Sequence, residues 1–363
     1  MSKKILIISH EYPPVVGGAG VVAKDLVKKL LNNNFEVTMV TNYSGRSYEP
    51  QYKLIEVKTI PKIRFYNFWM RIKKLPLESY DKIILNDVGA AMVGSYFFNN
   101  DLLMKTVVFL HGSEPESICK KPSLWFKFIG FENRYYNLLN NCSCIIAVSH
   151  FMKQKFLKYS EWYNLKYKIQ VIYNGIDNNI FYYDPINLYE KLNINTEHKL
   201  LLSVGRIVEN KGYLDKYNIF KTIAKELNYH WIIVGDGKFK SRFREIVIKD
   251  GLEEYVHFIG RVDRNQLRKY YSSVDYFWLL SNYEESLGLV YLESQFCLTP
   301  AIGRNRAGVK EVIINNKTGY LINNNSEVAL ILKKREKLMV EDFQDVINRF
   351  SFEKNTRKLK EWL

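Results

Sequence analysis

The chain has 363 residues, of which 47% are hydrophobic and 25% are charged, a balance typical of globular proteins and unlike that of disordered ones. No apolar run approaches the roughly 20 residues that a membrane-spanning helix needs. The four cysteines include no Cys-x-x-Cys and the six histidines no metal-ligand spacing. We therefore expect no disulfide framework and a protein that works in the cytoplasm.

The formal net charge of +15 is unevenly placed. Residues 1–180 carry 24 lysines and arginines against 14 acidic residues, whereas residues 181–363 carry 29 against 24. A basic surface favours nucleic acid, anionic lipid or a phosphorylated substrate, and composition alone does not choose among these.

Apolar runs alternate with amphipathic helical patterns along the chain. The first series comprises a strand at Ile5–Ser9, a helix at Ala19–Asn32 and strands at Glu36–Thr41, Lys82–Leu85, Thr106–Leu110, Cys144–Val148 and Ile169–Ile172. Beyond the turn-rich stretch Tyr173–Asn179, a second series comprises strands at Lys199–Val204, His230–Val234, His257–Ile259 and Tyr276–Leu280. This rhythm predicts an α/β protein with two Rossmann-like domains, 1–180 and 181–345, and a basic amphipathic helix within 346–363.

A glycine-rich turn, His10–Gly20, connects the first predicted strand to the first predicted helix. Gly17 and Gly18 permit close backbone approach, and a helix amino terminus favours an anion. Rossmann dehydrogenases use a related turn, but the full G-x-G-x-x-G is missing and Thr41 ends the second strand in place of an acidic residue. These differences argue against a dinucleotide, and a flexible glycine-rich turn that binds no ligand is the alternative.

Further polar residues follow predicted strands, where ligands of open α/β sheets bind. His111 follows the strand Thr106–Leu110. Arg206 and Lys211 follow the strand Lys199–Val204, and two cations in one short loop suit a diphosphate. A lone histidine is more often structural than ligand-binding, and surface cations are common. Spacing alone therefore also allows a structural role for His111 and a solvent-exposed position without a ligand for Arg206 and Lys211.

Two glutamates follow the strand Tyr276–Leu280. The polar turn is expected to open a helix that holds both Glu285 and Glu293. Eight residues of helix span about 12 Å, so the carboxylates cannot share one atom but can hold two parts of an elongated ligand. The alternative is a solvated helix face.

These segments, taken in order, resemble the retaining GT-B glycosyltransferases of family 4 (GT4), whose E-x7-E motif corresponds to Glu285 and Glu293. The matching segments are Gly17–Gly18, Phe109–Glu114, Ala147–Lys153, Val171–Asp177, Ser203–Tyr213, Val234–Lys238, Val256–Val262, Ser281–Glu293 and Pro300–Val312. Tyr173 and Lys310 stand where the family usually has proline. The resemblance implies the GT-B fold, with two Rossmann-like domains facing a central cleft and a last helix crossing back to the first domain.

The resemblance also implies roles for individual residues. It assigns catalysis to Glu285, His111, Arg206 and Lys211. It assigns donor binding to Gly17, Gly18, Arg206, Lys211, Val262, Glu285, Ser286, Leu287, Gly288 and Glu293. In this scheme Glu285 holds sugar hydroxyls, Glu293 holds the ribose hydroxyls, and His111 contacts the transferred sugar near the reacting carbon.

The activity implied is transfer of a hexose, with retention, from a UDP- or GDP-sugar to a glycan or lipid-linked acceptor. No Asp-x-Asp motif is present, so the resemblance implies a site without metal or other cofactor, in which protein cations stabilise the leaving diphosphate.

A basic aromatic stretch, Pro61–Pro76, is a candidate for the acceptor side. A helix bearing Arg64, Trp69, Arg71, Lys73 and Lys74 can rest on an anionic membrane surface, which makes peripheral attachment to the cytoplasmic membrane face an expectation. The alternative is an ordinary helix with aromatics inward and cations outward.

Two other functions stay open. A sugar-nucleotide epimerase of the same fold would bind the same donor, and a product assay without acceptor separates it from a transferase. A non-catalytic basic binding protein would show steep salt-dependent binding, but no nucleic-acid recognition motif accompanies the charge, so nucleic acid is not an expected partner.

Overall fold

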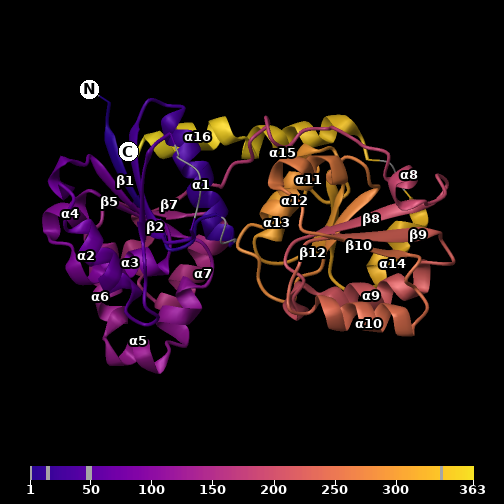
Figure 1. Cartoon of the computed structure of the whole chain (residues 1–363), viewed down its shortest axis with the longest axis horizontal. Coiled ribbons are helices and arrows are strands. Elements are labelled where there is room, and N and C mark those ends of the chain that lie inside the picture. Colours follow the sequence, from indigo (N-terminus) through magenta and orange to yellow (C-terminus); the bar gives the residue numbers. More distant parts are fainter. Residues whose placement is uncertain (1, 14–16, 46–50, 336–337) are drawn as a thin grey trace. The chain divides into compact units, whose positions relative to one another are not determined.

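The computed structural model describes residues 2–13, 17–45, 51–335 and 338–363 of the chain. It divides into two compact units (Figure 1): Met1–Asn174 together with Asn355–Leu363 form the first unit, and Gly175–Lys354 form the second. Each unit is built on its own parallel sheet.

The first unit contains seven strands and seven helices ahead of residue 174 in the described ranges. The strands are β1 (Lys4–Ile8), β2 (Glu36–Asn42), β3 (Lys53–Val57), β4 (Lys82–Leu85), β5 (Thr106–Leu110), β6 (Cys144–Ala147) and β7 (Ile169–Val171). The helices are α1 (Gly18–Leu31), α2 (Arg64–Ile72), α3 (Val88–Phe97), α4 (Asn100–Met104), α5 (Leu124–Phe128), α6 (Phe131–Asn141) and α7 (His150–Ser160). The strand order is β3-β2-β1-β4-β5-β6-β7, with every neighbour parallel.

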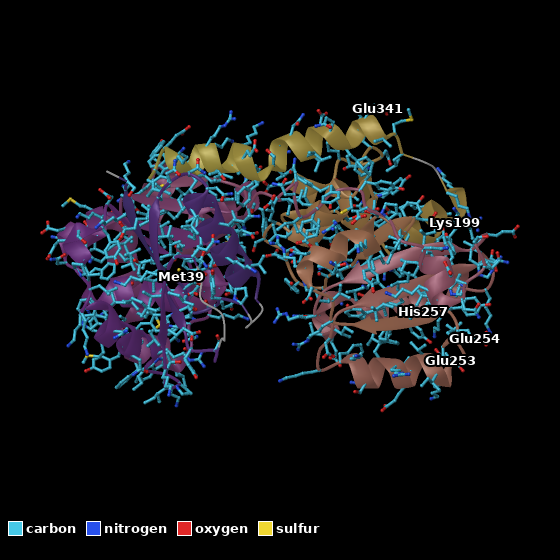
Figure 2. The ribbon with its side chains drawn as sticks, turned by 45° about the horizontal axis from the view of Figure 1, so that its top comes forward. Met39, Lys199, Glu253, Glu254, His257 and Glu341 are labelled. Atoms are coloured by element: carbon cyan, nitrogen blue, oxygen red, sulfur yellow. The ribbon has the colours of Figure 1, made fainter. Side chains whose placement is uncertain are left out.

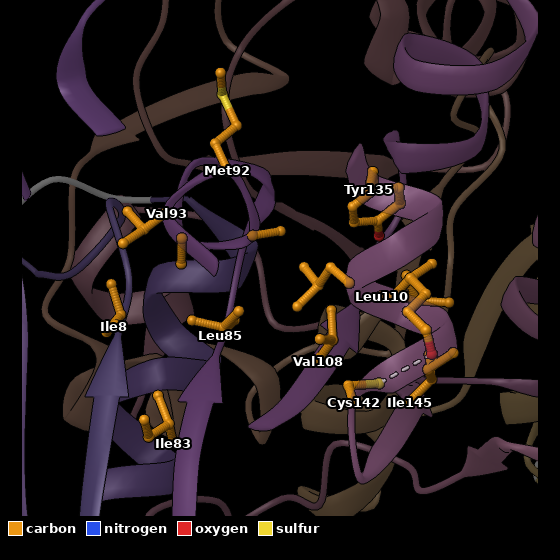
Figure 3. Close-up of a cluster of buried hydrophobic side chains, with 14 of the residues drawn as sticks. Ile8, Ile83, Leu85, Met92, Val93, Val108, Leu110, Tyr135, Cys142 and Ile145 are labelled. Carbon is orange, nitrogen blue, oxygen red and sulfur yellow. Dashed lines mark hydrogen bonds between the residues drawn. The ribbon is translucent and has the colours of Figure 1, made fainter. Parts of the chain in front are cut away.

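Both faces of this sheet are covered, which is why its central strands β1, β4, β5 and β6 consist almost entirely of apolar residues. Alternate residues of β1 enter different cores: Ile5 and Ile7 pack with α1, and Leu6 and Ile8 pack with α2 and α3. Figure 3 shows the second of these cores, where Ile8, Leu85 and Val108 from three neighbouring strands lie beneath Val93 of α3. The predicted strands of this half are therefore confirmed, and β3 is an additional edge strand.

The second unit contains six strands and eight helices that lie wholly within it, counted over its described residues. The strands are β8 (Lys199–Val204), β9 (Tyr229–Val234), β10 (Val256–Gly260), β11 (Tyr276–Leu279), β12 (Ala301–Arg304) and β13 (Gly319–Ile322). The helices are α8 (Leu188–Leu192), α9 (Tyr213–Ile223), α10 (Lys240–Lys249), α11 (Arg264–Tyr271), α12 (Leu289–Phe296), α13 (Val309–Val312), α14 (Ser326–Lys334) and α15 (Phe343–Phe350). The strand order is β10-β9-β8-β11-β12-β13, again parallel throughout.

A large aromatic core fills one face of the second sheet. Trp231 of β9 packs edge-on against Trp278 of β11, with ring centroids 5.0 Å apart. Lys216 of α9 is fully buried beside them, and its ammonium donates a hydrogen bond to Ser203 Oγ at 2.8 Å. The ammonium also lies 4.1 Å from the centroid of the Tyr213 ring. Burial, and then the charge of Lys211, lower the pKa of Lys216 far below its usual value.

Three histidines form a hydrogen-bonded row across the amino-terminal ends of β8, β9 and β10. His198 Nδ1 lies 2.9 Å from His230 Nε2, and His230 Nδ1 lies 3.0 Å from His257 Nε2. Figure 2 shows His257 in the second unit, near Glu253 and Glu254 of the preceding turn. Burial, followed by the neighbouring His257 and His198, lowers the pKa of His230 to about 4.

The segment predicted as one terminal helix is divided at Ser351 into α15 and α16 (Phe352–Lys360). Residues Asn355–Leu363 belong to the first unit, where Leu359 and Leu363 enter the same core as Ile5. Lys3 Nζ donates a hydrogen bond to the Leu363 carbonyl at 3.0 Å.

Candidate active site

The loop after β8 is shaped by two glycines. Gly205 has a φ of +143° and Gly212 a φ of +69°, values that favour glycine. A Cβ on Gly212 would lie 1.9 Å from the carbonyl oxygen of Leu280, so only glycine lets this loop pack against the end of β11. The loop thereby carries Lys211 to the residues that follow β11.

Lys211 meets Glu285 at this point. Its Nζ lies 2.8 Å from Glu285 Oε1, which also accepts a hydrogen bond from Ser281 Oγ at 2.5 Å. The ring of Tyr283 lies beneath the ammonium, 4.7 Å from Nζ. Burial alone would lower the pKa of Lys211, but Glu285 and Tyr283 outweigh burial and raise it. Lys211 is therefore a fixed, nearly buried cation.

The expectation that one helix holds both glutamates is wrong. Helix α12 begins at Leu289, and Glu285 lies in the loop before it. The reason is Gly288, whose φ of +83° turns the chain out of helical geometry, and the Gly308 amide holds the Glu285 carbonyl at 2.9 Å. The 12 Å helical separation therefore does not apply to this pair.

Glu293 lies on α12 and is buried, with an exposed fraction of 5%. The Tyr271 hydroxyl donates a hydrogen bond to its Oε2 at 3.1 Å, and Arg264 Nε lies 3.6 Å from its Oε1. Burial, with the charge of Glu293, raises the pKa of Tyr271 well above its usual value. Arg264 and Tyr271 of α11 therefore fix the second carboxylate, a contact that spacing along the chain does not reveal.

The other predicted donor-binding residues of the second unit lie in the loops that follow β8, β10 and β11. Arg206 is exposed, and its guanidinium forms no ion pair with any residue that the structure describes. Val262 is half-buried just after β10. Ser286 and Leu287 lie in the loop just before Gly288, which caps α12. The first backbone N–H groups of a helix lack helical acceptors.

In the first unit, Asp87 organises the ends of β1 and β4. Its carboxylate accepts hydrogen bonds from the backbone amides of His10 at 2.6 Å, Glu11 at 3.1 Å and Ala90 at 2.8 Å. His10 Nδ1 lies 3.3 Å from the same carboxylate, and the His10 ring stacks on Phe68. Burial would raise the pKa of Asp87, but the bonds from His10 and the amides lower it to about 2.

His111 and the glycine turn are brought together by Asn86. The Asn86 side chain contacts His111 Nε2 at 3.1 Å and the Ala19 carbonyl, just beyond Gly18, at 3.0 Å. Asn86 and Asp87 were not among the predicted site residues, although both directly follow β4 and lie at a strand end as His111 does.

The glycines of the turn do not use the left-handed region. Gly17 caps α1 with a φ of −136°, and a Cβ there would lie 1.8 Å from Glu11 Oε2. Gly18 begins α1, and a Cβ there would meet nothing within 4 Å, which leaves space at the helix start. Residues 14–16 of the predicted turn lie outside the described residues.

Helix α2 follows the alternative of an ordinary surface helix. Phe68 and Ile72 are buried, and Trp69 lies flat on Phe97 with ring centroids 5.1 Å apart. The predicted cations all point outward and are exposed: Arg64, Arg71, Lys73 and Lys74. No described helix has the length and apolar character needed to cross a membrane, and the described residues contain no group of three or more metal-ligating side chains.

The chain matches two family models. The model of the glycosyl transferases group 1 matches residues 186–359, and that of glycosyltransferase family 4 matches residues 16–179. An uncharacterized glycosyltransferase of Methanocaldococcus jannaschii is 27% identical over 336 residues, 88% of this chain and 85% of the relative. The N-acetyl-alpha-D-glucosaminyl L-malate synthase of Bacillus anthracis is 26% identical over 321 residues, 85% of this chain and 81% of the relative.

Solved structures show the same fold. The sucrose-phosphate synthase from Thermosynechococcus elongatus superimposes with a TM-score of 0.80 at 20% identity, covering 99% of this chain and 98% of that one. Anabaena HepE in complex with UDP and glucose gives a TM-score of 0.77 at 19% identity, with the same coverage. These superpositions show that the protein has the GT-B fold. The two family models, which match residues 186–359 and 16–179, show that it is a glycosyltransferase of the family 4 type.

Proposed function

We propose that the protein transfers a hexose, with retention at the anomeric carbon, from a nucleoside-diphosphate sugar to a glycan or lipid-linked acceptor. The observation that carries the proposal is the cation–carboxylate pair Lys211–Glu285, held at the carboxyl end of the second sheet by Gly205 and Gly212. Ligands of open α/β sheets bind at this edge.

The leaving diphosphate gains negative charge as the bond between sugar and phosphate breaks. A cation that is already in place stabilises that charge without reorganisation, an effect worth several kcal/mol in a site that excludes water. Lys211 is charged and nearly buried, and Arg206 offers an exposed bidentate fork from the same loop. Helix α12 adds its amino-terminal N–H groups. These cations support a metal-independent site.

The carboxylates then serve recognition. Glu285 would exchange its bond with Lys211 for sugar hydroxyls once the diphosphate attracts the ammonium. Glu293 would hold the ribose hydroxyls, oriented by Tyr271 and Arg264. His111 would contact the transferred sugar, and the open space at Gly18 would admit the diphosphate to the start of α1. Retention follows if the acceptor attacks the face that the phosphate leaves.

Anabaena HepE is solved with UDP and glucose, which supports a UDP-linked hexose as the donor, and a GDP-linked hexose is the alternative that the donor panel tests. For the acceptor, the first unit presents two apolar side chains on α5: Leu124 and Phe128 are each 84% exposed. Lys120, Lys121 and Lys127 lie within four residues of Leu124 in the chain and are exposed. Exposed apolar side chains with lysines close by in the chain suit an anionic lipid surface, so we propose peripheral attachment through α5 to reach a lipid-linked acceptor.

The test is a panel of UDP-, GDP- and ADP-hexoses, with donor binding and hydrolysis measured for wild type, Arg206→Ala and Glu293→Ala. Selective use of one donor that both variants lose supports the site, and binding of no nucleotide sugar contradicts it. Product analysis without acceptor distinguishes hydrolysis from epimerisation of the donor. Transfer that persists unchanged in EDTA supports a metal-independent reaction.

A further inference from the structure

The orientation of the Asn86 amide is determined by its surroundings. The side chain is fully buried, and one of its atoms lies 3.0 Å from the Ala19 carbonyl oxygen and 3.0 Å from Ser9 Oγ. A carbonyl oxygen only accepts hydrogen bonds, so the facing atom is the amide nitrogen, Nδ2. Its two hydrogens are used by Ala19 and Ser9, and Oδ1 is left to face His111.

This orientation decides which nitrogen of His111 carries the proton. Asn86 Oδ1 can only accept, and it lies 3.1 Å from His111 Nε2, so Nε2 must donate. Burial lowers the pKa of His111 and outweighs the carboxylates of Glu114 and Asp87, which act to raise it. The lowered pKa favours the neutral ring. A neutral imidazole has one proton, so Nδ1 carries a lone pair.

The other bonds of His111 fix its backbone and leave Nδ1 unused. Glu114 accepts the backbone amide of His111 at 2.9 Å, and the ring stacks on Phe109 with centroids 5.8 Å apart. No described residue forms a hydrogen bond with Nδ1, and the side chain keeps some exposure to solvent.

We propose that Asn86 is a positioning residue that holds His111 in its Nε2–H form, so that Nδ1 accepts a hydrogen bond from a hydroxyl of the bound sugar. The sugar hydroxyl as the partner of Nδ1 rests on the proposed function. The hydrogen bond between Asn86 and His111 does not. A ring that presents an acceptor selects hydroxyl donors and rejects a carbonyl or carboxylate oxygen at the same place. His111, at the end of β5, would thus contribute to the specificity for the donor sugar.

The experiment is nitrogen-15 NMR of the histidine rings in the free, full-length protein. We expect His111 at neutral pH to show a protonated Nε2 with a slowly exchanging N–H resonance and an unprotonated Nδ1. Asn86→Leu keeps the branched shape of the side chain and removes its hydrogen bonds, so the N–H resonance should disappear. Asn86→Asp keeps the acceptor, so the resonance should remain and the pKa of His111 should rise.

His150, exposed on α7, serves as the internal control because its spectrum should be the same in all three proteins. In the transfer assay, kcat/KM for the donor should fall roughly tenfold or more in Asn86→Leu, with partial recovery in Asn86→Asp. A protonated Nδ1 in wild type, or an unchanged N–H resonance in Asn86→Leu, would overturn the proposal. The spectra need no donor, so they test Asn86 even if the donor panel contradicts the proposed function.

Discussion

The ammonium of Lys211 lies 2.8 Å from the carboxylate of Glu285, although 74 residues separate them in the chain. Both side chains are nearly buried, and their neighbours Ser281 and Tyr283 are polar or aromatic. The pair therefore links the two loops that end β8 and β11, and each member has the other as its charge partner until an anionic ligand arrives.

Removing the charge of Lys211 should impair catalysis. In Lys211→Met the stem remains, but the cation for the leaving diphosphate is lost, so kcat/KM for transfer should fall by about 10²–10³-fold. Steady-state kinetics with the preferred donor measures this loss. Lys221→Met, which removes a more exposed lysine on α9 of the same unit, is the matched control. Unchanged kinetics in Lys211→Met would show that Lys211 does not contribute to the reaction.

Asp87 should contribute to stability in a defined pH window. Its folded-state pKa of about 2 lies below the ordinary 3.8, so the contribution is present above about pH 4 and is lost as the pH falls toward 2. Asp87→Asn should lower the free energy of unfolding at pH 7 by about 2 kcal/mol and flatten the acid limb. Urea unfolding at several pH values checks this. Asp101→Asn, at an exposed position of α4, should change neither.

The histidine row should make the second unit sensitive to mild acid. The folded-state pKa of His230, about 4, lies below the ordinary 6.5, so the unfolded chain binds more protons between these values and stability falls as the pH drops through that window. In His230→Phe this loss should be absent. Thermal unfolding from pH 7 to 4 measures it, with His150→Phe as control; parallel curves for wild type and His230→Phe would contradict the expectation.

Lys216 should cost stability. Its ammonium has one hydrogen bond, to Ser203, and otherwise faces aromatic rings. Lys216→Met replaces a buried amine, whose charged form burial disfavours, by an apolar chain of similar length, so the free energy of unfolding at pH 7 should rise by about 1–3 kcal/mol.

The pH dependence distinguishes the cause of that change. The pKa of Lys216 is lowered in the folded state, so wild-type stability should rise with pH up to about 10.5, and this rise should be missing in Lys216→Met. Destabilisation by Lys216→Met would instead show that the aromatic rings hold the cation favourably.

Helix α5 should mediate membrane attachment. Leu124→Ser with Phe128→Ser removes both exposed apolar side chains, and sedimentation with vesicles of phosphatidylcholine and phosphatidylglycerol should show at least a tenfold loss of binding. The matched control, Leu330→Ser with Met339→Ser, removes two exposed apolar residues from the second unit. Equal binding by both double variants would contradict attachment through α5.

Much of the fold was predictable because both faces of each sheet are buried. The strands β1, β5 and β8 each contain at least three consecutive apolar residues, and their positions agree with those predicted. The strands β12 and β13 were missed because each has four residues and includes glycine, which carries no hydrophobic pattern. Their pairing comes from the sheet rather than from local sequence.

The candidate site was predictable as a set of strand-end residues and less so as a geometry. Lys211 and Glu285 were both selected, but their contact depends on Gly212 packing against Leu280, which is a tertiary contact. The position of Glu285 outside α12 depends on the left-handed Gly288. The packing of Trp69 on Phe97 could not be predicted, because an amphipathic pattern does not say whether its apolar face meets lipid or the protein core.

The membership of residues 355–363 in the first unit has a consequence for how the protein is made. The second unit is continuous in the chain, whereas the first needs Leu359 and Leu363 to complete the core around Ile5. On the ribosome, residues 175–354 can therefore finish folding before the segment synthesised earlier does. Until residues 355–363 have been translated, part of the apolar surface of the amino-terminal sheet stays uncovered.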